Sequence, residues 1–341
     1  MNDAITWITF IVAAAAVVAA GARLARQGVE ISEETGIGGL WIGVVLLATA
    51  TSLPELVTNI SAAAIDEADL AIGNLFGSSM ANMAILAMID LMNRQRRVWQ
   101  AVSLGHTLVG SLAVALTALT AMFIVSELGW TVFHIGVDTL VVAGFYLLGT
   151  RVVFRHEYLE ALTRIAERTR EDGQDVDPDA GIKLPPLRSL RGFGISAAII
   201  LIAGPFLANS ASGISDMTGI QSSFVGVTFL AAVTSLPELV TAVAAVRIGA
   251  YDLAAGNLFG SNAFNMLTLV FADIAYTPGA ILSDVSSAQL VAALAAMILM
   301  ALATMGIVYR AERRYYLVEP DAALVLLAYV IGLVLVYEAG A

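Results

Sequence analysis

Two glutamates lie inside otherwise apolar stretches of the sequence and are the strongest candidates for chemistry. Glu55 and Glu238 each end the same five-residue motif, Thr-Ser-Leu-Pro-Glu. A charged side chain at the centre of a bilayer costs about 3 kcal/mol on insertion scales, so such residues are functional candidates by default. A single buried glutamate can also be a protonated or hydrogen-bonded structural group. Two glutamates in identical motifs favour a shared role, and cation binding is the chemistry that they predict.

The proline before each glutamate predicts further oxygen ligands. Pro54 and Pro237 have no amide hydrogen and clash with the carbonyl group four residues earlier. We therefore expect freed backbone carbonyls in the preceding turns, around Ala48–Thr51 and Ala231–Thr234. Freed carbonyls in lipid need a partner, and a cation is one. The alternative is a proline kink whose carbonyls are satisfied by water or by the serine of the motif, Ser52 or Ser235.

A stripe of amides and hydroxyls follows each motif. Side chains at positions i, i+4 and i+8 share one face of a helix, and a polar stripe within the membrane must face protein or a water-filled path. The alternative is that these polar residues only stabilise the packing between helices, because serine and glycine are frequent at helix contacts. The neighbouring glycines fit either interpretation, since they loosen a helix or permit close approach. The two stripes are Asn74, Ser78 and Asn82, and Asn257, Ser261 and Asn265.

The ligands predicted in this way are all oxygen atoms. Neither motif contains histidine, and the chain has no cysteine. Oxygen ligands select hard cations such as Ca²⁺, Mg²⁺, Na⁺ and H⁺. Two carboxylates neutralise one divalent ion, and the empty site retains two negative charges. Because an empty charged site would return through lipid at high cost, monovalent ions or protons should accompany the return, which predicts obligatory exchange.

These residues belong to an internal repeat with an offset of 183 residues. The segment 51–58 recurs unchanged as 234–241, and 69–83 matches 252–266 at eleven of fifteen positions. Asp90 corresponds to Asp273, and we expect both to lie near helix ends in contact with solvent or backbone. The chain therefore consists of two related halves.

The elements that position these residues are predicted to be transmembrane helices. Hydrophobic residues make up 59% of the chain and charged residues 13%, about half of what a soluble domain carries. The net charge of −11 argues against a nucleic-acid partner. Continuous apolar runs of about 20 residues predict helices rather than barrel strands. The predicted spans are 4–22, 38–63, 69–92, 99–125, 130–150, 191–209, 221–246, 252–275, 286–308 and 321–338.

Ten spans predict an all-α polytopic membrane protein built from two five-helix halves of opposite orientation, a signature of secondary transporters. The first half is 1–150, with its repeat motif at 43–90, and the second is 191–341, with its motif at 226–273. A cytoplasmic loop, 151–190, joins them. All 17 lysines and arginines then fall on one side, which the positive-inside rule makes cytoplasmic, with both termini outside.

The doubled Thr-Ser-Leu-Pro-Glu and Gly-Asn-x-x-Gly-Ser motifs resemble those of the calcium/cation antiporter superfamily, specifically its prokaryotic sodium/calcium exchanger branch. The resemblance covers nearly the whole chain and implies the sodium/calcium exchanger fold in a prokaryotic cytoplasmic membrane. It implies that Glu55 and Glu238 hold Ca²⁺ together with the carbonyls of Thr51 and Thr234. The sodium ligands that it implies are the same glutamates with Ala48, Ser52, Ser78, Ala231, Ser235 and Ser261.

One position departs from the family pattern. Family members commonly carry an aspartate where this chain has Asn265, whose counterpart in the first half is Asn82. We expect an antiporter that exports Ca²⁺ in exchange for Na⁺, and this departure keeps a proton-coupled or Mg²⁺ exchanger as the alternative; a cation channel is a more remote one. We expect no enzymatic activity, no cofactor, inorganic cations and the lipid bilayer as the partners, and a functional monomer.

Overall fold

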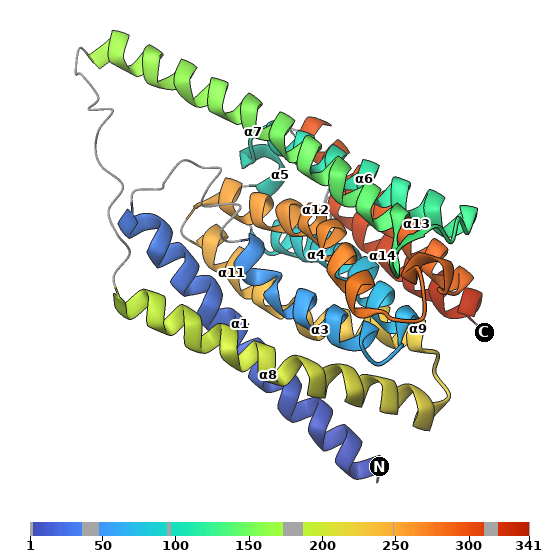
Figure 1. Ribbon diagram of the computed structural model, residues 1–341. Coiled ribbons are helices and arrows are strands. Elements are labelled where there is room, and N and C mark those ends of the chain that lie inside the picture. Colours follow the sequence, from blue (N-terminus) through green and yellow to red (C-terminus); the bar gives the residue numbers. More distant parts are fainter. Residues whose placement is uncertain are drawn as a thin grey trace.

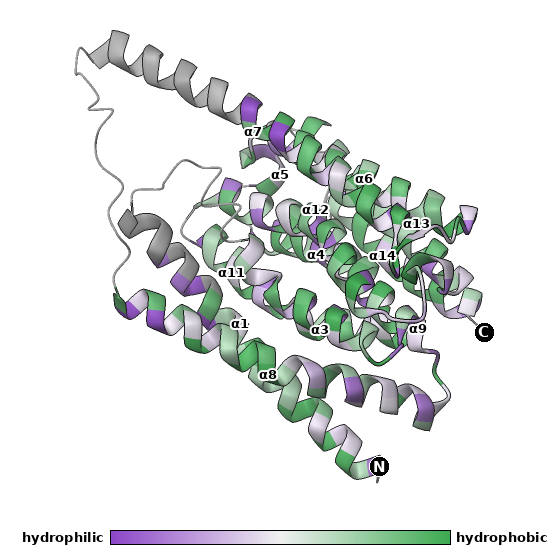
Figure 2. Cartoon of the chain, viewed as in Figure 1, coloured by the Kyte–Doolittle hydropathy of each residue, from purple (hydrophilic) through white to green (hydrophobic). Residues whose placement is uncertain are grey.

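The computed structural model describes residues 3–35, 48–93, 97–172, 187–247, 249–309 and 320–340. Among these residues, eight helices are long and apolar enough to cross a membrane. Hydrophobic residues predominate along these helices (Figure 2), and many of their large apolar side chains are exposed. The eight are α1 (Asp3–Thr35), α4 (Ala68–Met92), α6 (His106–Ser126), α7 (Val137–Asp172), α8 (Leu187–Thr218), α12 (Tyr251–Ala275), α13 (Ser287–Tyr309) and α14 (Pro320–Gly340).

The two spans that carry the motif glutamates are interrupted at matching places. In the second half, α9 (Ser222–Val225), a π-helical turn η1 (Gly226–Leu230) and α10 (Ala231–Thr234) precede α11 (Leu236–Arg247), with a bend of 43° between α10 and α11. In the first half, residues 48–51 are helical and α3 (Leu53–Ala63) follows. The interruptions fall at Ser52 (φ −83°, ψ 4°) and Ser235 (φ −87°, ψ 3°), two residues before each proline. Residues 38–47 of the span predicted at 38–63 lie outside the described residues.

Several predicted boundaries are wrong for identifiable reasons. The span predicted at 130–150 begins at Val137, because a small hairpin, β1 (Thr131–Val132) and β2 (Ile135–Gly136), precedes it. The span predicted at 99–125 consists of the short α5 (Val98–Ala101) and then α6. Within 151–190, predicted as a cytoplasmic loop whose first part has helical apolar spacing, α7 continues to Asp172 and α8 begins at Leu187. Hydropathy locates the part of a helix inside the membrane, and helices α1, α7 and α8 extend beyond it.

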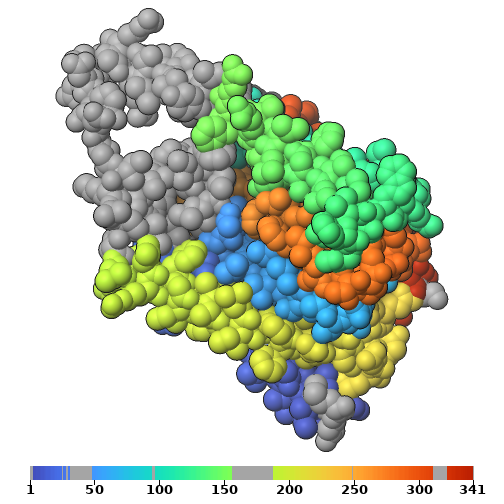
Figure 3. Space-filling view, viewed as in Figure 1, coloured from blue at the N-terminus to red at the C-terminus, as the bar shows by residue number. Residues whose placement is uncertain are grey.

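The motif helices lie inside the bundle. Helices α1 and α8 pack side by side along one side and contact α11 and α3, respectively (Figure 1). Figure 3 shows α3, in blue, between α8, in yellow-green, and α12, in orange, and both contacts are extensive. Helix α4 is almost completely buried, because α3, α12, α13, α14 and the α9–η1 segment pack around it.

Glycines of the repeat let the two halves approach at backbone distance. A Cβ atom added at Gly77 of α4 would collide with the backbone of Val227 in η1, and one added at Gly226 would lie 2.6 Å from the carbonyl oxygen of Leu70. Glycine has no Cβ, which is what permits a close approach of this kind. Of the two roles that the sequence leaves open for the glycines, the structure thus shows close packing between α4 and the matching segment of the other half.

Carboxylates near the helix ends accept hydrogen bonds from backbone amides, and these contacts occur in both halves at the offset of 183 residues. Asp90 accepts the backbone amide of Val98 at 2.6 Å, and Asp273 accepts that of Ile281 at 2.9 Å. Both carboxylates are fully buried. The prediction that these two aspartates lie near helix ends is confirmed, and their contacts include backbone amides. The pairs Asp69 with Ser286 and Asp252 with Ser103 repeat in the same way.

The buried side chain of Arg97 forms an ion pair at one end of the bundle. The guanidinium group of Arg97 donates to both carboxylate oxygens of Asp321, at 2.6 and 2.7 Å, and lies 3.9 Å from Asp90. At the offset of 183, Asp321 corresponds to Asp138, whereas Arg97 corresponds to Ala280. The ion pair between Arg97, directly before α5, and the start of α14 therefore has no counterpart at the matching positions of the repeat.

Replacing Arg97 by alanine should destabilise the fold by about 3 kcal/mol, because it leaves Asp321 and Asp90 without their buried cationic partner. The measurement is thermal unfolding of the purified protein in detergent. Arg151→Ala, at an exposed position of α7, is the matched control and should leave the unfolding midpoint unchanged. Equal midpoints for both variants would show that the bridge contributes no stability.

Candidate functional site

The two motif glutamates occupy the first turns of α3 and α11, directly after the interruptions. Both side chains are fully buried, and in each carboxylate Oε2 has no hydrogen-bond partner among the described residues. Carboxylate oxygens buried without donors are costly unless a cation compensates them. Each of these two atoms is therefore a candidate cation ligand.

Serines hold each carboxylate from the opposite half of the chain. The hydroxyl group of Ser235 donates to Glu55 Oε1 at 3.2 Å, and that of Ser52 donates to Glu238 Oε1 at 3.4 Å. These are the same contact related by the offset of 183. Each glutamate thus depends on a residue of the other half for its orientation, and the two halves build one site together.

The threonines and the polar stripes form a second symmetric set of contacts. Thr51 Oγ1 donates to Asn257 Oδ1, and Thr234 Oγ1 donates to Asn74 Oδ1, both at 3.1 Å. The hydroxyls of Thr51 and Ser261 lie 3.4 Å apart, as do those of Ser78 and Thr234. The side chains named in these contacts are fully buried. The polar stripes therefore face the glutamate motifs of the opposite half.

The carbonyls of Ala48 and Ala231 are not freed as expected. Ala48 accepts the amide of Ser52 at 2.9 Å, and Ala231 accepts the amide of Ser235 at 3.0 Å. A proline removes only the hydrogen bond that its own nitrogen would donate, and these two bonds are donated by residues that precede it. The hydroxyl groups of Thr51 and Thr234 also lie within 3.2 and 3.5 Å of these two carbonyl oxygens, so a cation would compete with them for the second lone pair.

The two amides one turn beyond the stripe serines differ from each other. Asn82 Nδ2 donates to Asn262 Oδ1 at 2.8 Å, while Asn82 Oδ1 has no partner among the described residues. Asn265 is fully buried, and neither of its amide atoms has a hydrogen-bond partner there. Leaving a buried amide without any hydrogen-bond partner costs about 1–3 kcal/mol. We therefore expect a bound ion or water molecule to contact the amide of Asn265.

Asn59 is a site residue that the sequence reasoning missed. It lies one turn after Glu55, and its Oδ1 accepts Asn74 Nδ2 at 2.6 Å, which directs Asn74 Oδ1 towards Thr234. The counterpart of Asn59 in the other half is Ala242, and Asn257 Nδ2 has no hydrogen-bond partner in the described part of the chain. The available signal was an asparagine four residues after Glu55 on an otherwise apolar helix face.

Asn59→Ala should weaken the apparent affinity for the transported cation about tenfold, because Asn74 loses the partner that fixes its orientation. The maximal rate should fall less than the affinity. Saturation curves of ion-driven uptake separate the two quantities. Asn209→Ala, at an exposed position of α8, is the matched control; an affinity unchanged in both variants would contradict a positioning role for Asn59.

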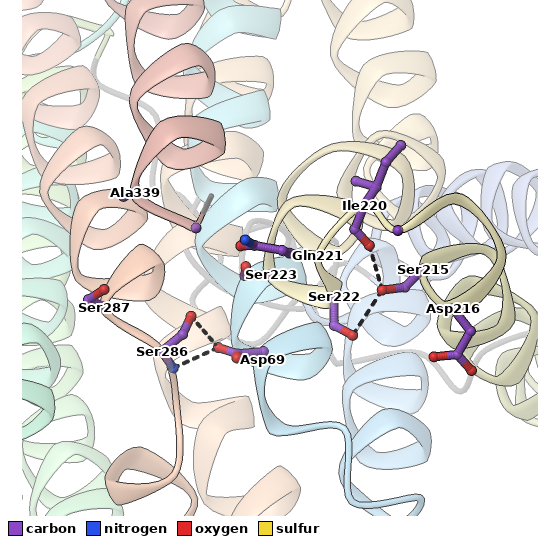
Figure 4. Close-up of a pocket in the computed structure, with 12 residues that line it drawn as sticks. Asp69, Ser215, Asp216, Ile220, Gln221, Ser222, Ser223, Ser286, Ser287 and Ala339 are labelled. Atoms are coloured by element: carbon purple, nitrogen blue, oxygen red, sulfur yellow. Dashed lines mark hydrogen bonds between the residues drawn. The ribbon is translucent and has the colours of Figure 1, made fainter.

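Two cavities open at opposite ends of α4 and do not include the predicted site residues. One, of about 610 Å³, lies where α8 and α14 end, and five serines, Asp69 and Asp216 are among the residues that line it (Figure 4). The other, of about 500 Å³, lies beside Asn93 and Tyr251. The residues predicted to bind cations are at most 3% exposed, so the site lies between the cavities and is buried from both.

This arrangement offers oxygen ligands, among them those of two ionisable carboxyl groups. Carboxylates, carbonyls, hydroxyls and amide oxygens are the ligands of hard cations. The donors come from both halves at matching positions, so any movement of one half against the other changes the ligands on both sides of a bound ion. This geometry suits the release of an ion to alternate ends of the bundle.

Comparisons with known proteins agree with this description. The model of the family described as "Sodium/calcium exchanger protein" matches residues 5–154 and 188–338. The inner membrane protein YrbG of Escherichia coli is 30% identical over 252 residues, which are 72% of each chain. A solved structure of the sodium-calcium exchanger NCX_Mj gives a TM-score of 0.59 at 17% identity, covering 96% of this chain and 97% of that one. The H⁺/Ca²⁺ exchanger CAX gives 0.61 at 12% identity, covering 98% and 88%.

Proposed function

Because the chain belongs to the sodium/calcium exchanger family, we propose that it is a secondary active antiporter that exports Ca²⁺ in exchange for Na⁺ by alternating access. The observation that carries the proposal is the pair of buried glutamates. Each accepts a serine hydroxyl from the opposite half and has one carboxylate oxygen without a donor among the described residues. No bond is made or broken in the transported ion, so the activity is transport and not catalysis.

The site supplies what a calcium ion requires. Glu55 and Glu238 neutralise its charge, and the carbonyls of Thr51 and Thr234 complete the set that the family resemblance implies. Ca²⁺ takes six to eight oxygen ligands with flexible geometry, and the surrounding hydroxyls and amides offer more oxygens. Sodium ions would use the same glutamates with the oxygens of Ala48, Ser52, Ser78, Ala231, Ser235 and Ser261.

A proton-coupled exchanger is the second candidate. Asn265 is an amide where sodium/calcium exchangers commonly carry an aspartate, so a ligand expected for sodium is uncharged here. Among similar folds, CAX is described as an H⁺/Ca²⁺ exchanger. Exchange of another divalent ion such as Mg²⁺ belongs to the same class of mechanism.

We further propose the orientation in the membrane. The lysines and arginines lie on one side of the ten-span topology, which places both termini outside and the segment 151–190 in the cytoplasm. The relative YrbG is described as an inner membrane protein, which supports a location in a prokaryotic cytoplasmic membrane. A single chain contributes all the proposed ligands, so the monomer should be functional.

Ion-driven flux in reconstituted vesicles tests the proposed coupling. Vesicles loaded with Na⁺ should accumulate external Ca²⁺ when the outward sodium gradient is imposed, and an outward proton gradient alone should not drive the uptake. Vesicles without protein give the leak. Uptake that follows the proton gradient and ignores sodium would replace the first candidate by the second.

A further inference from the structure

Two carboxylates supply the negative charge of the candidate site. Glu55 and Glu238 are its only ionisable side chains among the described residues. The other buried carboxylates that the structure describes, Asp90, Asp138 and Asp273, lie at helix ends and accept backbone amide hydrogens. Those carboxylates fasten helices, so they do not add to the charge that a transported ion meets at the centre.

Two further buried side chains beside the motifs are neutral amides. Asn82 and Asn265 lie one turn beyond the stripe serines, and both are fully buried. Their oxygen atoms have no donors among the described residues. An amide oxygen can ligate a cation, but it contributes no formal charge. Additional cations therefore have oxygen ligands here, but no additional carboxylate that would neutralise their charge.

The symmetry divides the charge equally between two half-sites. Glu55 with Ser235 forms one, and Glu238 with Ser52 forms the other, related by the offset of 183. Each half-site carries one carboxylate with one oxygen that lacks a donor. One monovalent cation in each half-site, or one divalent cation shared between them, satisfies both.

The net charge of the site depends on which cations it holds. One Ca²⁺ or two monovalent cations make the site neutral. One monovalent cation leaves a charge of −1, and three leave +1. Because the site residues are at most 3% exposed, any net charge is buried away from water. An uncompensated buried charge costs several kcal/mol, so the neutral forms are the ones that cross between the two sides.

We infer that this chain exchanges one Ca²⁺ for two monovalent cations and moves no net charge across the membrane. The inference rests on the proposed exchange but does not depend on whether the monovalent ion is Na⁺ or H⁺. At equilibrium the calcium concentration ratio then equals the square of the ratio of the monovalent ion, and the membrane potential does not enter.

The experiment is the steady-state calcium distribution in vesicles that contain the purified protein. The sodium ratio is varied, and the potential is set independently with potassium and valinomycin. A sodium ratio of about tenfold should sustain a calcium ratio of about 100-fold, because the free energies of two sodium ions and one calcium ion balance. The logarithmic plot should have a slope of about two, and an imposed potential should leave it in place. Glu55→Gln vesicles provide the correction for leak.

A slope of about three would overturn the inference. The exchange would then move one charge, and a potential of about 100 mV would shift the calcium ratio about 50-fold, from about 2.3 kcal/mol per elementary charge. A slope of about two against a proton ratio, with no response to sodium, would support this stoichiometry while overturning sodium coupling. Absence of calcium movement with either ion would overturn the proposed exchange itself.

Discussion

Replacing Glu55 by glutamine should reduce calcium exchange at least about 100-fold, because it removes half of the charge that holds the ion. Two opposite charges about 4 Å apart interact by about 4 kcal/mol at the effective dielectric constant of a protein site, which exceeds the free energy of a hundredfold change. Glu238→Gln should cause the same loss, since the two glutamates occupy equivalent places. Uptake of radioactive calcium into vesicles measures the effect.

Stability measurements separate a cation-binding role of the glutamates from a purely structural one. If the glutamates bind cations, the glutamine variant should be at least as stable as the original protein when ions are absent, because a buried charge has been removed. If their role is structural, the variant should lose stability. Calcium should raise the unfolding temperature of the original protein and not that of the variant, since a ligand stabilises only a fold that binds it. Glu127→Gln, at an exposed position after α6, is the matched control. A variant that loses stability but keeps the calcium shift would contradict the assignment.

Replacing Asn265 by aspartate should make the exchange more dependent on sodium and sensitive to the membrane potential. The new carboxylate would sit at a fully buried amide that has no hydrogen-bond partner among the described residues, so it displaces no existing contact. A third negative charge favours a third sodium ion by electrostatic attraction of several kcal/mol. The logarithmic slope of the calcium ratio against the sodium ratio should rise from about two towards about three.

The symmetric position offers a comparison for this variant. Asn82→Asp should raise the slope as well, but with a larger loss of stability, because Asn82 Nδ2 donates to Asn262 and an aspartate cannot. Asn209→Asp, at an exposed position of α8, controls for the change of residue type. A slope that stays at about two in Asn265→Asp would refute the idea that this position sets the number of coupled ions.

Much of the candidate site is accessible from sequence because it is repeated. The offset of 183 places Glu55 with Glu238 and Asn74 with Asn257 in equivalent environments, and the structure brings each stripe against the opposite motif. Hydropathy predicts the spans because the bilayer imposes a length on apolar segments. Binding of ions by these residues stays a prediction.

Contacts that break the repeat were not predicted. The orientation of Asn74 depends on Asn59, whose counterpart is Ala242, and the bridge from Arg97 to Asp321 has alanine at the matching place. A search for similarity discards such differences. Hydropathy also does not register the hydrogen bonds at the helix starts, such as the local one from the amide of Val137 to Trp130 after the hairpin and the long-range one from the amide of Ser103 to Asp252 before α6.

The crossing of ligands between the halves has a consequence for how the protein is made. Glu55 accepts its hydrogen bond from Ser235, which lies 180 residues later in the chain. At about 5–20 residues per second, a ribosome needs about 10–40 s to synthesise that separation. The carboxylate of Glu55 therefore enters the membrane long before its partner exists. During this interval the nascent first half has buried polar groups without their partners. We therefore expect quality-control proteases to recognise this incomplete first half more readily than the finished protein.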